Sequence, residues 1–512
     1  MSVAGVAGAP DTVRLHPDDE HNRRLVEQTH PPGWINPQPR GRYNLVVIGS
    51  GTAGLTAAAG CATVGGRAAL IERHLTGGDC LITGCVPSKA LISASRAAAA
   101  ARRAAEMGVR VSGVEPDFAA VMARMRRLRA RISPADSVHH LREIGVDVFL
   151  GQGAFIGPDT LEVGGARLRF ARALIATGGR AVVPPIPGLA ESGFLTNETL
   201  FELTELPRRF VMIGAGPIGC EMAQAFQRLG AQVTLLDTND RILHREDPNA
   251  AALVQRALVQ DGVRLVLPAT VIRVAVRNGE KAVTVEHQGQ VEELACDAVL
   301  AGVGRAPNVE GLHLEAAGVR YEKAGVAVDD RLRTSNPRIY AAGDVCAPLK
   351  FTHLANALGR MALVNALFWG RARASRLVVP WCTYTAPEVA HVGLYEAQAK
   401  ARGERVTTLT VPFTENDRAV LDGEDEGFIR VHLRQGSDRI LGATIVAAHA
   451  GDLLTYFTLA MTSGKGLGWL ASAIYPYPTQ AELIKKAAGQ HLQTTLTPGV
   501  RRLLAWLLAR RR

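Results

Sequence analysis

Residues 43–54 read YNLVVIGSGTAG, a run of mostly apolar residues followed by a glycine-rich turn. The apolar run predicts a buried parallel strand, and the alanine-rich segment after the turn predicts a helix. Gly49 would allow the tight turn, Gly51 would let a pyrophosphate approach the backbone, and Gly54 would permit close packing of helix on strand. The N-terminus of the helix would then face the phosphates. Because Glu72 ends the next strand, where a carboxylate can accept from ribose hydroxyls, the stretch predicts a dinucleotide site.

The same succession occurs a second time. Residues 210–219 read FVMIGAGPIG, and a helix is expected to continue to Gln227. Asp237 closes the following strand, where an acid would accept the 2′-OH of NAD and repel the 2′-phosphate of NADP. Arg241 could still bind such a phosphate, but the balance favours NADH. The glycines of this second cradle are Gly214, Gly216 and Gly219.

Length and composition indicate a soluble protein of about three domains. No run approaches the ~20 apolar residues that a membrane span needs, and no secretory signal is visible, so we expect a cytoplasmic location. The formal net charge is +10, and part of the excess lies in residues 122–132, MARMRRLRARI. Without a nucleic-acid-binding motif, this charge is interpreted as solvated helix faces plus a basic tail, and no nucleic-acid partner is expected.

Two of the seven cysteines stand in a distinctive context, GGDCLITGCVPSK at residues 77–89. Cys80 and Cys85 are separated by four residues in the chain and lead into a predicted helix. A disulfide could close where that helix begins, and the helix dipole together with Lys89 would favour a thiolate. A static disulfide is unexpected in a reducing compartment, and metal sites use shorter spacings. The pair is therefore predicted to be redox-active.

At this point the sequence resembles the class I flavoprotein disulfide reductases, which include dihydrolipoamide dehydrogenase, glutathione reductase and mercuric reductase. The resemblance runs from about residue 43 to residue 490. Besides the two cradles and the cysteine segment, it includes ATGG at 176–179, GRAPN at 304–308 and YAAGD at 340–344.

The resemblance implies FAD on the first cradle and NADH or NADPH on the second. Hydride would enter FAD, and the electron pair would pass to the disulfide. Cys85 would be the sulfur nearest the flavin and form a charge-transfer pair with it, while Cys80 would meet the substrate. Lys89 would pair with Glu221 beside the flavin, and Asp344 would hold the ribityl chain. The other cofactor-binding residues implied are Thr177, Gly178, Gly304, Arg305 and His353.

One segment departs from the dihydrolipoamide dehydrogenase pattern. Where those enzymes carry a proton-shuttling His followed by Glu, residues 477–482 read YPTQAE, so Tyr477 replaces the His and Glu482 is kept. A phenol with a pKa near ~10 is a poor base at neutral pH. Tyr at this place, and REDP at 245–248, resemble the mercuric reductase branch. The chain departs from that branch too, because it has no cysteine after Cys382 and no N-terminal CxxC domain.

Three hypotheses remain open. The first is a mercuric-reductase-like enzyme that reduces Hg(II), Cu(II) or a similar acceptor; a substrate metal would bind only transiently at Cys80 and Cys85, without a resident metal site. The second is a disulfide reductase of dihydrolipoamide dehydrogenase type, with His353 as the candidate base. The third is a non-enzymatic redox sensor or membrane-associated flavoprotein.

The predicted fold is α/β, with two Rossmann-like three-layer ββα domains and a C-terminal α+β dimerisation domain. Tyr477 and Glu482 are expected to complete the site of the partner subunit in a homodimer. The C-terminal RRLLAWLLARRR either lies on an anionic membrane as a peripheral contact or packs on the protein. The predicted boundaries are an extended arm at 1–42, a discontinuous FAD domain at 43–192 and 305–378, an NAD(P)H domain at 193–304, an interface domain at 379–490, and a basic amphipathic tail at 491–512.

Overall fold

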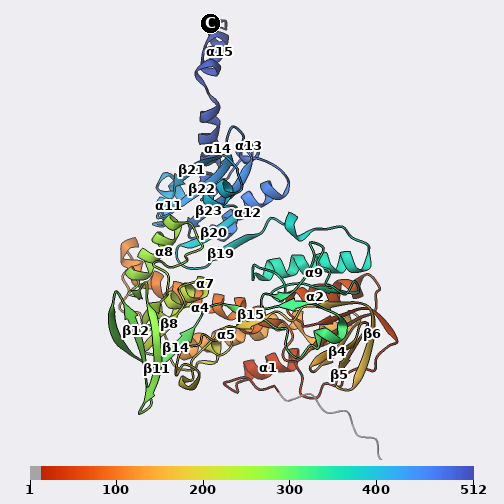
Figure 1. The fold of residues 1–512 in the computed structure, drawn as a ribbon. Coiled ribbons are helices and arrows are strands. Elements are labelled where there is room, and N and C mark those ends of the chain that lie inside the picture. Colours follow the sequence, from red (N-terminus) through yellow and green to blue (C-terminus); the bar gives the residue numbers. More distant parts are fainter. Residues whose placement is uncertain (1–12, 512) are drawn as a thin grey trace, which may run out of the picture. The chain divides into compact units, whose positions relative to one another are not determined.

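The computed structural model describes residues 13–511, except for the side chains of residues 494 and 495. The described chain forms two compact units (Figure 1). The first contains residues 13–214, 225–234 and 270–376, and the second contains residues 215–224, 235–269 and 377–511. Helix α7 (Pro217–Arg228) and strand β9 (Gln232–Leu236) have residues in both units.

The first unit is built around a seven-stranded sheet with the order β3-β2-β1-β6-β5-β4, in which β18 also pairs with β6. Strands β1, β2, β3, β6 and β18 are parallel, whereas β4 and β5 form an antiparallel extension. Since β18 comes from the later part of the chain, two distant segments build one sheet. The strands are β1 (Arg42–Ile48), β2 (Ala68–Glu72), β3 (Val146–Leu150), β4 (Gly153–Gly157), β5 (Thr160–Val163), β6 (Ala166–Ile175) and β18 (Ile339–Ala341).

Two helices of this unit approach each other closely. A Cβ on Gly359 of α9 would lie 2.4 Å from the carbonyl oxygen of Ala53 in α2, so only glycine fits there. This contact joins the helix after the first glycine turn to the segment that follows Asp344. The helices of the unit are α1 (Glu20–Thr29), α2 (Thr52–Thr63), α3 (Gly78–Ile82), α4 (Cys85–Arg103), α5 (Phe118–Ile132), α6 (Val138–Glu143) and α9 (Thr352–Leu367).

Helix α1 corrects the expectation of an extended arm over residues 1–42. Asp19 caps the helix by accepting a hydrogen bond from the backbone N–H of Asn22 at 2.8 Å. Leu25 and Val26 are buried in the core of the unit. The sequence pattern missed the helix because its apolar stripe is only these adjacent residues among polar ones. Residues 1–12 of the expected arm lie outside the described residues.

The Arg-rich helix α5 also differs from its prediction. Arg126 and Arg129, expected on a solvated face, are only 7% and 4% exposed. Each finds acceptors on other segments: Arg126 pairs with Asp19, and Arg129 donates to Ile82 O and Asn22 Oδ1. These acceptors offset part of the cost of burying the two charges, although Arg126 Nη1 and Arg129 Nε have no hydrogen-bond partner within the described part of the chain.

The remaining strands of the first unit form smaller sheets. Strand β8 pairs in parallel with β14, β7 pairs with β15, β16 pairs with β17, and β11, β12 and β13 form an antiparallel sheet. Their bounds are β7 (Gly179–Ala181), β8 (Arg209–Ile213), β11 (Thr270–Arg277), β12 (Glu280–His287), β13 (Gln290–Cys296), β14 (Ala298–Ala301), β15 (Arg305–Pro307), β16 (Tyr321–Glu322) and β17 (Gly325–Val326).

The second unit contains a five-stranded antiparallel sheet with the order β19-β20-β23-β22-β21. Residues of α12 and α14 share one apolar core with this sheet, in which Phe413 and Phe457 are fully buried. This is the α+β domain expected after residue 379. The strands are β10 (Arg264–Val266), β19 (Pro380–Thr383), β20 (Glu388–Gly393), β21 (Val406–Pro412), β22 (Phe428–Arg434) and β23 (Ile440–Ala447). The helices are α8 (Pro248–Gln260), α10 (Glu396–Ala401), α11 (Asp417–Asp422), α12 (Ala450–Thr462), α13 (Leu467–Ala471), α14 (Glu482–Thr495) and α15 (Pro498–Ala509).

The last two helices extend past the expected end of this domain at residue 490. Helix α14 continues to Thr495, and α15 follows with no buried residue. Within residues 13–511, none of the helices has the length and apolar character required to cross a bilayer.

Candidate active site

The first glycine turn has the stereochemistry of a phosphate cradle. Gly49 has φ +95°, and a Cβ there would lie 2.4 Å from Ala176 O. A Cβ on Gly54 would lie 1.8 Å from Gly49 O, so both positions exclude side chains by contact with backbone. A Cβ on Gly51, in contrast, would meet nothing within 4 Å. Gly51 therefore opens onto free space at the start of α2, whose N-terminus is not capped by a side chain.

Glu72 is fixed at the end of β2 beside this turn. Its Oε2 accepts from the backbone N–H of Ser50 at 2.9 Å and from the Ser50 hydroxyl at 2.7 Å. Its Oε1 accepts from the N–H of His74 at 2.8 Å. A carboxylate held in this way next to an open helix N-terminus fits the ribose and pyrophosphate of FAD.

Two of the sequence motifs that flank the cradle are hydrogen-bonded to each other. The Thr177 hydroxyl donates to Asn308 O at 2.7 Å, and the Asn308 side chain donates to Thr177 O at 3.0 Å. Gly178 has φ +68° and Gly304 has φ +130°, conformations that favour glycine. The ATGG and GRAPN segments therefore form one structural feature, the β7–β15 pair.

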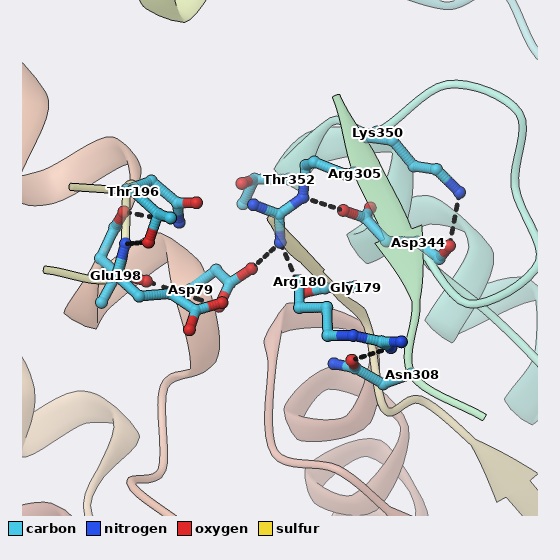
Figure 2. Close-up of polar contacts among 12 residues, drawn as sticks. Asp79, Gly179, Arg180, Thr196, Glu198, Arg305, Asn308, Asp344, Lys350 and Thr352 are labelled. Carbon is cyan, nitrogen blue, oxygen red and sulfur yellow. Dashed lines mark hydrogen bonds and ion pairs between the residues drawn. The ribbon is translucent and has the colours of Figure 1, made fainter. Parts of the chain in front are cut away.

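Arg305 connects the cysteine segment to the later FAD-domain segment (Figure 2). Its Nη2 donates to the carboxylate of Asp79 and, at 2.6 Å, to Gly179 O. Its Nε lies 3.5 Å from Asp344 Oδ2. Because Asp79 immediately precedes Cys80, this guanidinium fixes the start of the cysteine loop relative to Asp344.

Asp344 and Lys350 are partly desolvated neighbours of Arg305 (Figure 2). Burial raises the pKa of the Asp344 carboxyl, whereas Arg305 and Lys350 act in the opposite direction. Burial lowers the pKa of Lys350, whose ammonium donates to Asp344 O at 2.5 Å and to Ala347 O at 2.6 Å. Arg305 thus lies beside the Asp344 carboxylate and Lys350 binds the Asp344 backbone carbonyl, while the carboxylate offers acceptor oxygens for a polyol chain.

The cysteine loop joins two helices. Cys80 lies in α3, and Cys85 is the first residue of α4, where the helix dipole favours a thiolate. Cys85 Sγ lies 3.3 Å from the Thr352 hydroxyl at the start of α9. A hydrogen bond with Cys85, and then burial, raise the pKa of the Cys80 thiol. The two sulfurs are therefore neighbours, as a reversible disulfide requires, and Cys85 is the exposed member of the pair.

The second glycine turn shows the same contrast between closed and open positions. Gly214 has φ +105°, and a Cβ there would lie 2.6 Å from Gly302 O. A Cβ on Gly216 would meet nothing within 4 Å, whereas Gly219 is buried. This pattern fits a second nucleotide.

Asp237 is oriented by the second turn. Its Oδ2 accepts from the backbone N–H of Ala215 at 2.6 Å, and its Oδ1 accepts from the N–H of Asn239 at 2.8 Å. The Arg241 guanidinium donates to His244 O at 2.8 Å. Asp237 is therefore in place for a ribose hydroxyl, and Arg241 is bound to its own loop.

Lys89 and Glu221 belong to different compact units, so their pairing stays a prediction. Lys89 is half-buried one turn into α4. Glu221 is buried in the second unit and accepts from the backbone N–H of Tyr384 at 2.9 Å.

Tyr477 and Glu482 lie in the second unit. Tyr477 precedes α14, and Glu482 is the first residue of that helix. Tyr477 is 71% exposed, and its hydroxyl donates to Asp417 Oδ2 at 3.1 Å. This hydrogen bond raises the pKa of the phenol above its usual value. Tyr477 is thus a still poorer base at neutral pH than an isolated tyrosine. His353 is exposed in α9, next to Thr352, and its ring stacks on Phe351 with centroids 5.4 Å apart.

The structure adds contacts that the sequence motifs did not reveal. Asp79 was visible only as a polar residue before Cys80, and its ion pair with Arg305 depends on tertiary structure. Thr352 and Lys350 had no motif around them. Among residues 13–511, no cluster of three or more His, Cys, Asp or Glu side chains is arranged to hold a metal ion.

Comparison with known proteins gives a consistent assignment. The model for the pyridine nucleotide-disulphide oxidoreductases matches residues 43–366, and that for the dimerisation domain of the same enzymes matches residues 379–488. A mercuric reductase from Bacillus cereus is 35% identical over 454 residues, covering 88% of this chain and 72% of the relative. A dihydrolipoyl dehydrogenase from Bacillus subtilis is 31% identical over 464 residues, covering 87% of this chain and 97% of the relative.

A solved structure is also similar. It is the Cu(II) complex of the HOCl-induced flavoprotein disulfide reductase RclA from Escherichia coli, with a TM-score of 0.78 and 29% identity. The similarity covers 86% of this chain and 98% of that chain.

Proposed function

Because the chain belongs to the pyridine nucleotide-disulphide oxidoreductase family, we propose that Cys80 and Cys85 are its redox centre and that they reduce a metal ion, Hg(II) or Cu(II). The general type of reaction follows from the family. The chain is an FAD-dependent oxidoreductase that uses NAD(P)H, and its C-terminal domain supports a homodimer. The proposal concerns the residues and the acceptor.

The environment of Tyr477 is the observation that carries the choice of acceptor. Oxidising or forming a dithiol substrate requires a base near neutrality to move its proton. The phenol of Tyr477, hydrogen-bonded to Asp417 with a raised pKa, is unsuited to this task. A soft metal ion binds directly to thiolates and needs no such shuttle. Thus the partner subunit's Tyr477 and the partner subunit's Glu482 would border the cysteine pair without acting as a dithiol base.

The electron balance is simple. When bound, FAD would supply the chemistry that carries an electron pair from NAD(P)H to the disulfide. Cys80 and Cys85 then hold two electrons as thiolates. Their reoxidation to a disulfide reduces one Hg(II) to Hg(0), or two Cu(II) to two Cu(I). Gly49, Gly51, Gly54 and Glu72 would hold the dinucleotide.

Several other residues have proposed roles in this chemistry. The Thr352 hydroxyl, 3.3 Å from Cys85 Sγ, would donate to the thiolate and stabilise its charge. Arg305, Asp344, Thr177, Gly178 and Gly304 would border the flavin. Lys89 would pair with Glu221 near it. At the second cradle Gly214, Gly216, Gly219 and Asp237 would bind the co-substrate, with a preference for NADH.

The alternative acceptor is a dithiol or disulfide of the dihydrolipoamide type. A dihydrolipoyl dehydrogenase is among the relatives, which favours this candidate. In this case His353 is the candidate base, because it adjoins Thr352, which contacts Cys85. We rank this second since the His353 ring is stacked on Phe351.

An oxidant panel tests the proposal. Purified holoenzyme is supplied with NADH or NADPH and with Hg(II), Cu(II), lipoamide, oxidised glutathione or a quinone, and consumption of the nucleotide is followed. We expect the metal ions to give kcat/KM values at least ~10²-fold above that of lipoamide. The reaction with lipoamide needs a general base, and the loss of such a base usually slows a reaction by at least this factor. Rapid lipoamide turnover would overturn the choice of a metal ion in favour of the second candidate.

We also propose that helix α15 lies on an anionic membrane surface. Val500, Leu503, Leu504 and Leu507 recur at helical spacing and are exposed, and Trp506 beside them is exposed as well. Arginines flank this face, and residues 491–512 contain no acidic side chain. An amphipathic helix with these properties fits an interface of anionic lipids. The competing arrangement, a helix packed on the protein, is opposed by the lack of any buried residue in α15.

Vesicle flotation tests the membrane contact. The double variant Arg510→Gln/Arg511→Gln should bind phosphatidylserine-containing vesicles roughly 30-fold less than the wild type, since each arginine contributes about 1 kcal/mol near such a surface. The charge-matched control is Arg371→Gln/Arg373→Gln, which removes two exposed arginines of the first unit. Equal flotation of the wild type and a chain lacking residues 491–512 would refute the contact.

A further inference from the structure

Helix α1 lies outside the range of the family model, which begins at residue 43, yet it is packed against the cysteine loop. Leu25 and Val26 of α1 share one apolar cluster with Leu81 and Ile82. These two loop residues stand between Cys80 and Cys85 in the chain. Helix α1 therefore packs against the segment that carries both sulfurs.

A buried guanidinium completes this contact. Arg129 of α5 donates from Nη1 to Ile82 O at 2.7 Å and from Nη2 to Asn22 Oδ1 at 2.7 Å. Ile82 is the last residue of α3, so its carbonyl has no partner within that short helix. The Arg129 fork is thus the group that fixes the C-terminal end of α3, three residues before Cys85.

Helix α1 is in turn held firmly in place. Asp19, its N-cap, pairs with Arg126 at 2.5 Å, one turn before Arg129 on α5. Asn22 also donates from Nδ2 to Pro17 O at 2.8 Å, which orients its Oδ1 toward Arg129. At the other end of α1, Thr29 O accepts from the backbone N–H of Thr76 at 3.2 Å, shortly before the cysteine loop.

We propose that Asn22 and Arg129 are positioning residues that hold the Ile82 carbonyl and thereby set the stability of the Cys80–Cys85 disulfide. A disulfide forms only within a narrow range of Cα and Cβ separations. The intervening residues include Gly84, which gives the loop backbone freedom. Fixing Ile82 O restricts that freedom and raises the effective concentration of one thiol at the other. The inference rests on the proposed assignment of the redox centre to these two cysteines.

The test measures the thiol–disulfide equilibrium of the holoenzyme in glutathione buffers. In this exchange the two thiols and one oxidised glutathione give the protein disulfide and two reduced glutathiones. Acid quenching, alkylation and mass spectrometry of the peptide containing Cys80 and Cys85 report the oxidised fraction. We expect Asn22→Ala and Arg129→Met each to lower the equilibrium constant about 10-fold, which raises the reduction potential of this two-electron couple by about 30 mV.

Matched controls lie on the same two helices. Arg127→Met on α5 and Arg24→Ala on α1 remove exposed arginines and should leave the constant within about twofold of wild type. Arg129→Lys keeps the charge but cannot donate in fork geometry to both acceptors, so its constant should fall between those of the wild type and Arg129→Met.

The outcomes separate the possible failures. If Arg129→Met does not fold, Asn22→Ala and Arg129→Lys decide the question. An unchanged exchange constant in variants that melt at lower temperature would reduce Arg129 to a structural role and refute the inference. If Cys80 and Cys85 of the wild type do not exchange with glutathione, the assignment of these cysteines as the redox centre is wrong.

Discussion

Cys85→Ser is expected to lower NAD(P)H-driven reduction of the oxidant by at least about 10³-fold, while FAD content and melting temperature stay close to wild type. The large loss follows because a serine hydroxyl forms neither a thiolate at neutral pH nor a disulfide with Cys80. The fold should tolerate the change, since Cys85 is exposed and Ser has nearly the same shape. Steady-state consumption of NAD(P)H measures the rate, and absorbance of the reduced holoenzyme measures the flavin–thiolate band.

A comparison with Cys80→Ser makes this experiment specific. Both variants should lose turnover, but only Cys85→Ser should lose the long-wavelength charge-transfer absorption. The control is Cys346→Ser, which changes another cysteine of the same unit and should keep both rate and band. If the band persisted in Cys85→Ser and vanished in Cys80→Ser, the two sulfurs would have opposite roles from those proposed.

The parts of the fold that the sequence predicted are those whose signals are local. Strand, glycine turn and helix follow one another within about twenty residues around Gly49 and again around Gly214. Only part of the glycine requirement is local: Gly54 faces Gly49 O within the turn, whereas Gly49 faces Ala176 O and Gly214 faces Gly302 O, both distant in the chain. The order of strand, turn and helix is itself a local pattern. Such patterns can be recognised without knowing what else packs against them.

The environment of the arginines could not be predicted in this way. Arg126, Arg127 and Arg129 are chemically alike in the sequence, yet only Arg127 is exposed. The difference arises because Asp19, Asn22 and Ile82 O, all distant in the chain, supply acceptors on one face of α5. Burial of an arginine depends on such partners and carries no signal in its own neighbourhood.

The same limit applies to the candidate site. Both the Asp79 segment and the Arg305 segment were recognised as motifs, but their ion pair joins positions 226 residues apart. Thr352, which contacts Cys85, lies 267 residues from it. The sequence identified which segments carry chemistry, whereas the structure shows that Arg305 and Thr352 couple those segments to the cysteine loop.

Tyr477→His is expected to raise the oxidation of dihydrolipoamide by NAD⁺ by about 10²-fold, the smaller end of the usual effect of a general base. An imidazole at this position would restore the family pattern of His followed by Glu, in which Glu482 is the first residue of α14. A carboxylate beside the ring would orient it and stabilise its protonated form. Formation of NADH measures the rate.

The pH dependence distinguishes a true base from a general change in the site. A histidine must be neutral to accept the dithiol proton, so the gained rate should be absent at low pH and rise through a pKa above the free value of ~6.5, because the carboxylate would stabilise the protonated ring. The wild type should show no such rise, because the phenol of Tyr477 is protonated throughout this range and its hydrogen bond to Asp417 raises its pKa further.

Glu482→Gln in the Tyr477→His background is the control for the orienting carboxylate. It should lower the gained rate of dihydrolipoamide oxidation roughly 10-fold. A Tyr477→His protein with no gain at any pH would mean that this residue does not reach the cysteine pair of the other subunit. The identity of the acceptor would then have to depend on groups of the first unit, where His353 is the candidate nearest to Cys85 through Thr352. Under the proposed function, Tyr477 would decide between a proton-shuttling dithiol enzyme and one that gives its electrons directly to a thiolate-bound metal ion.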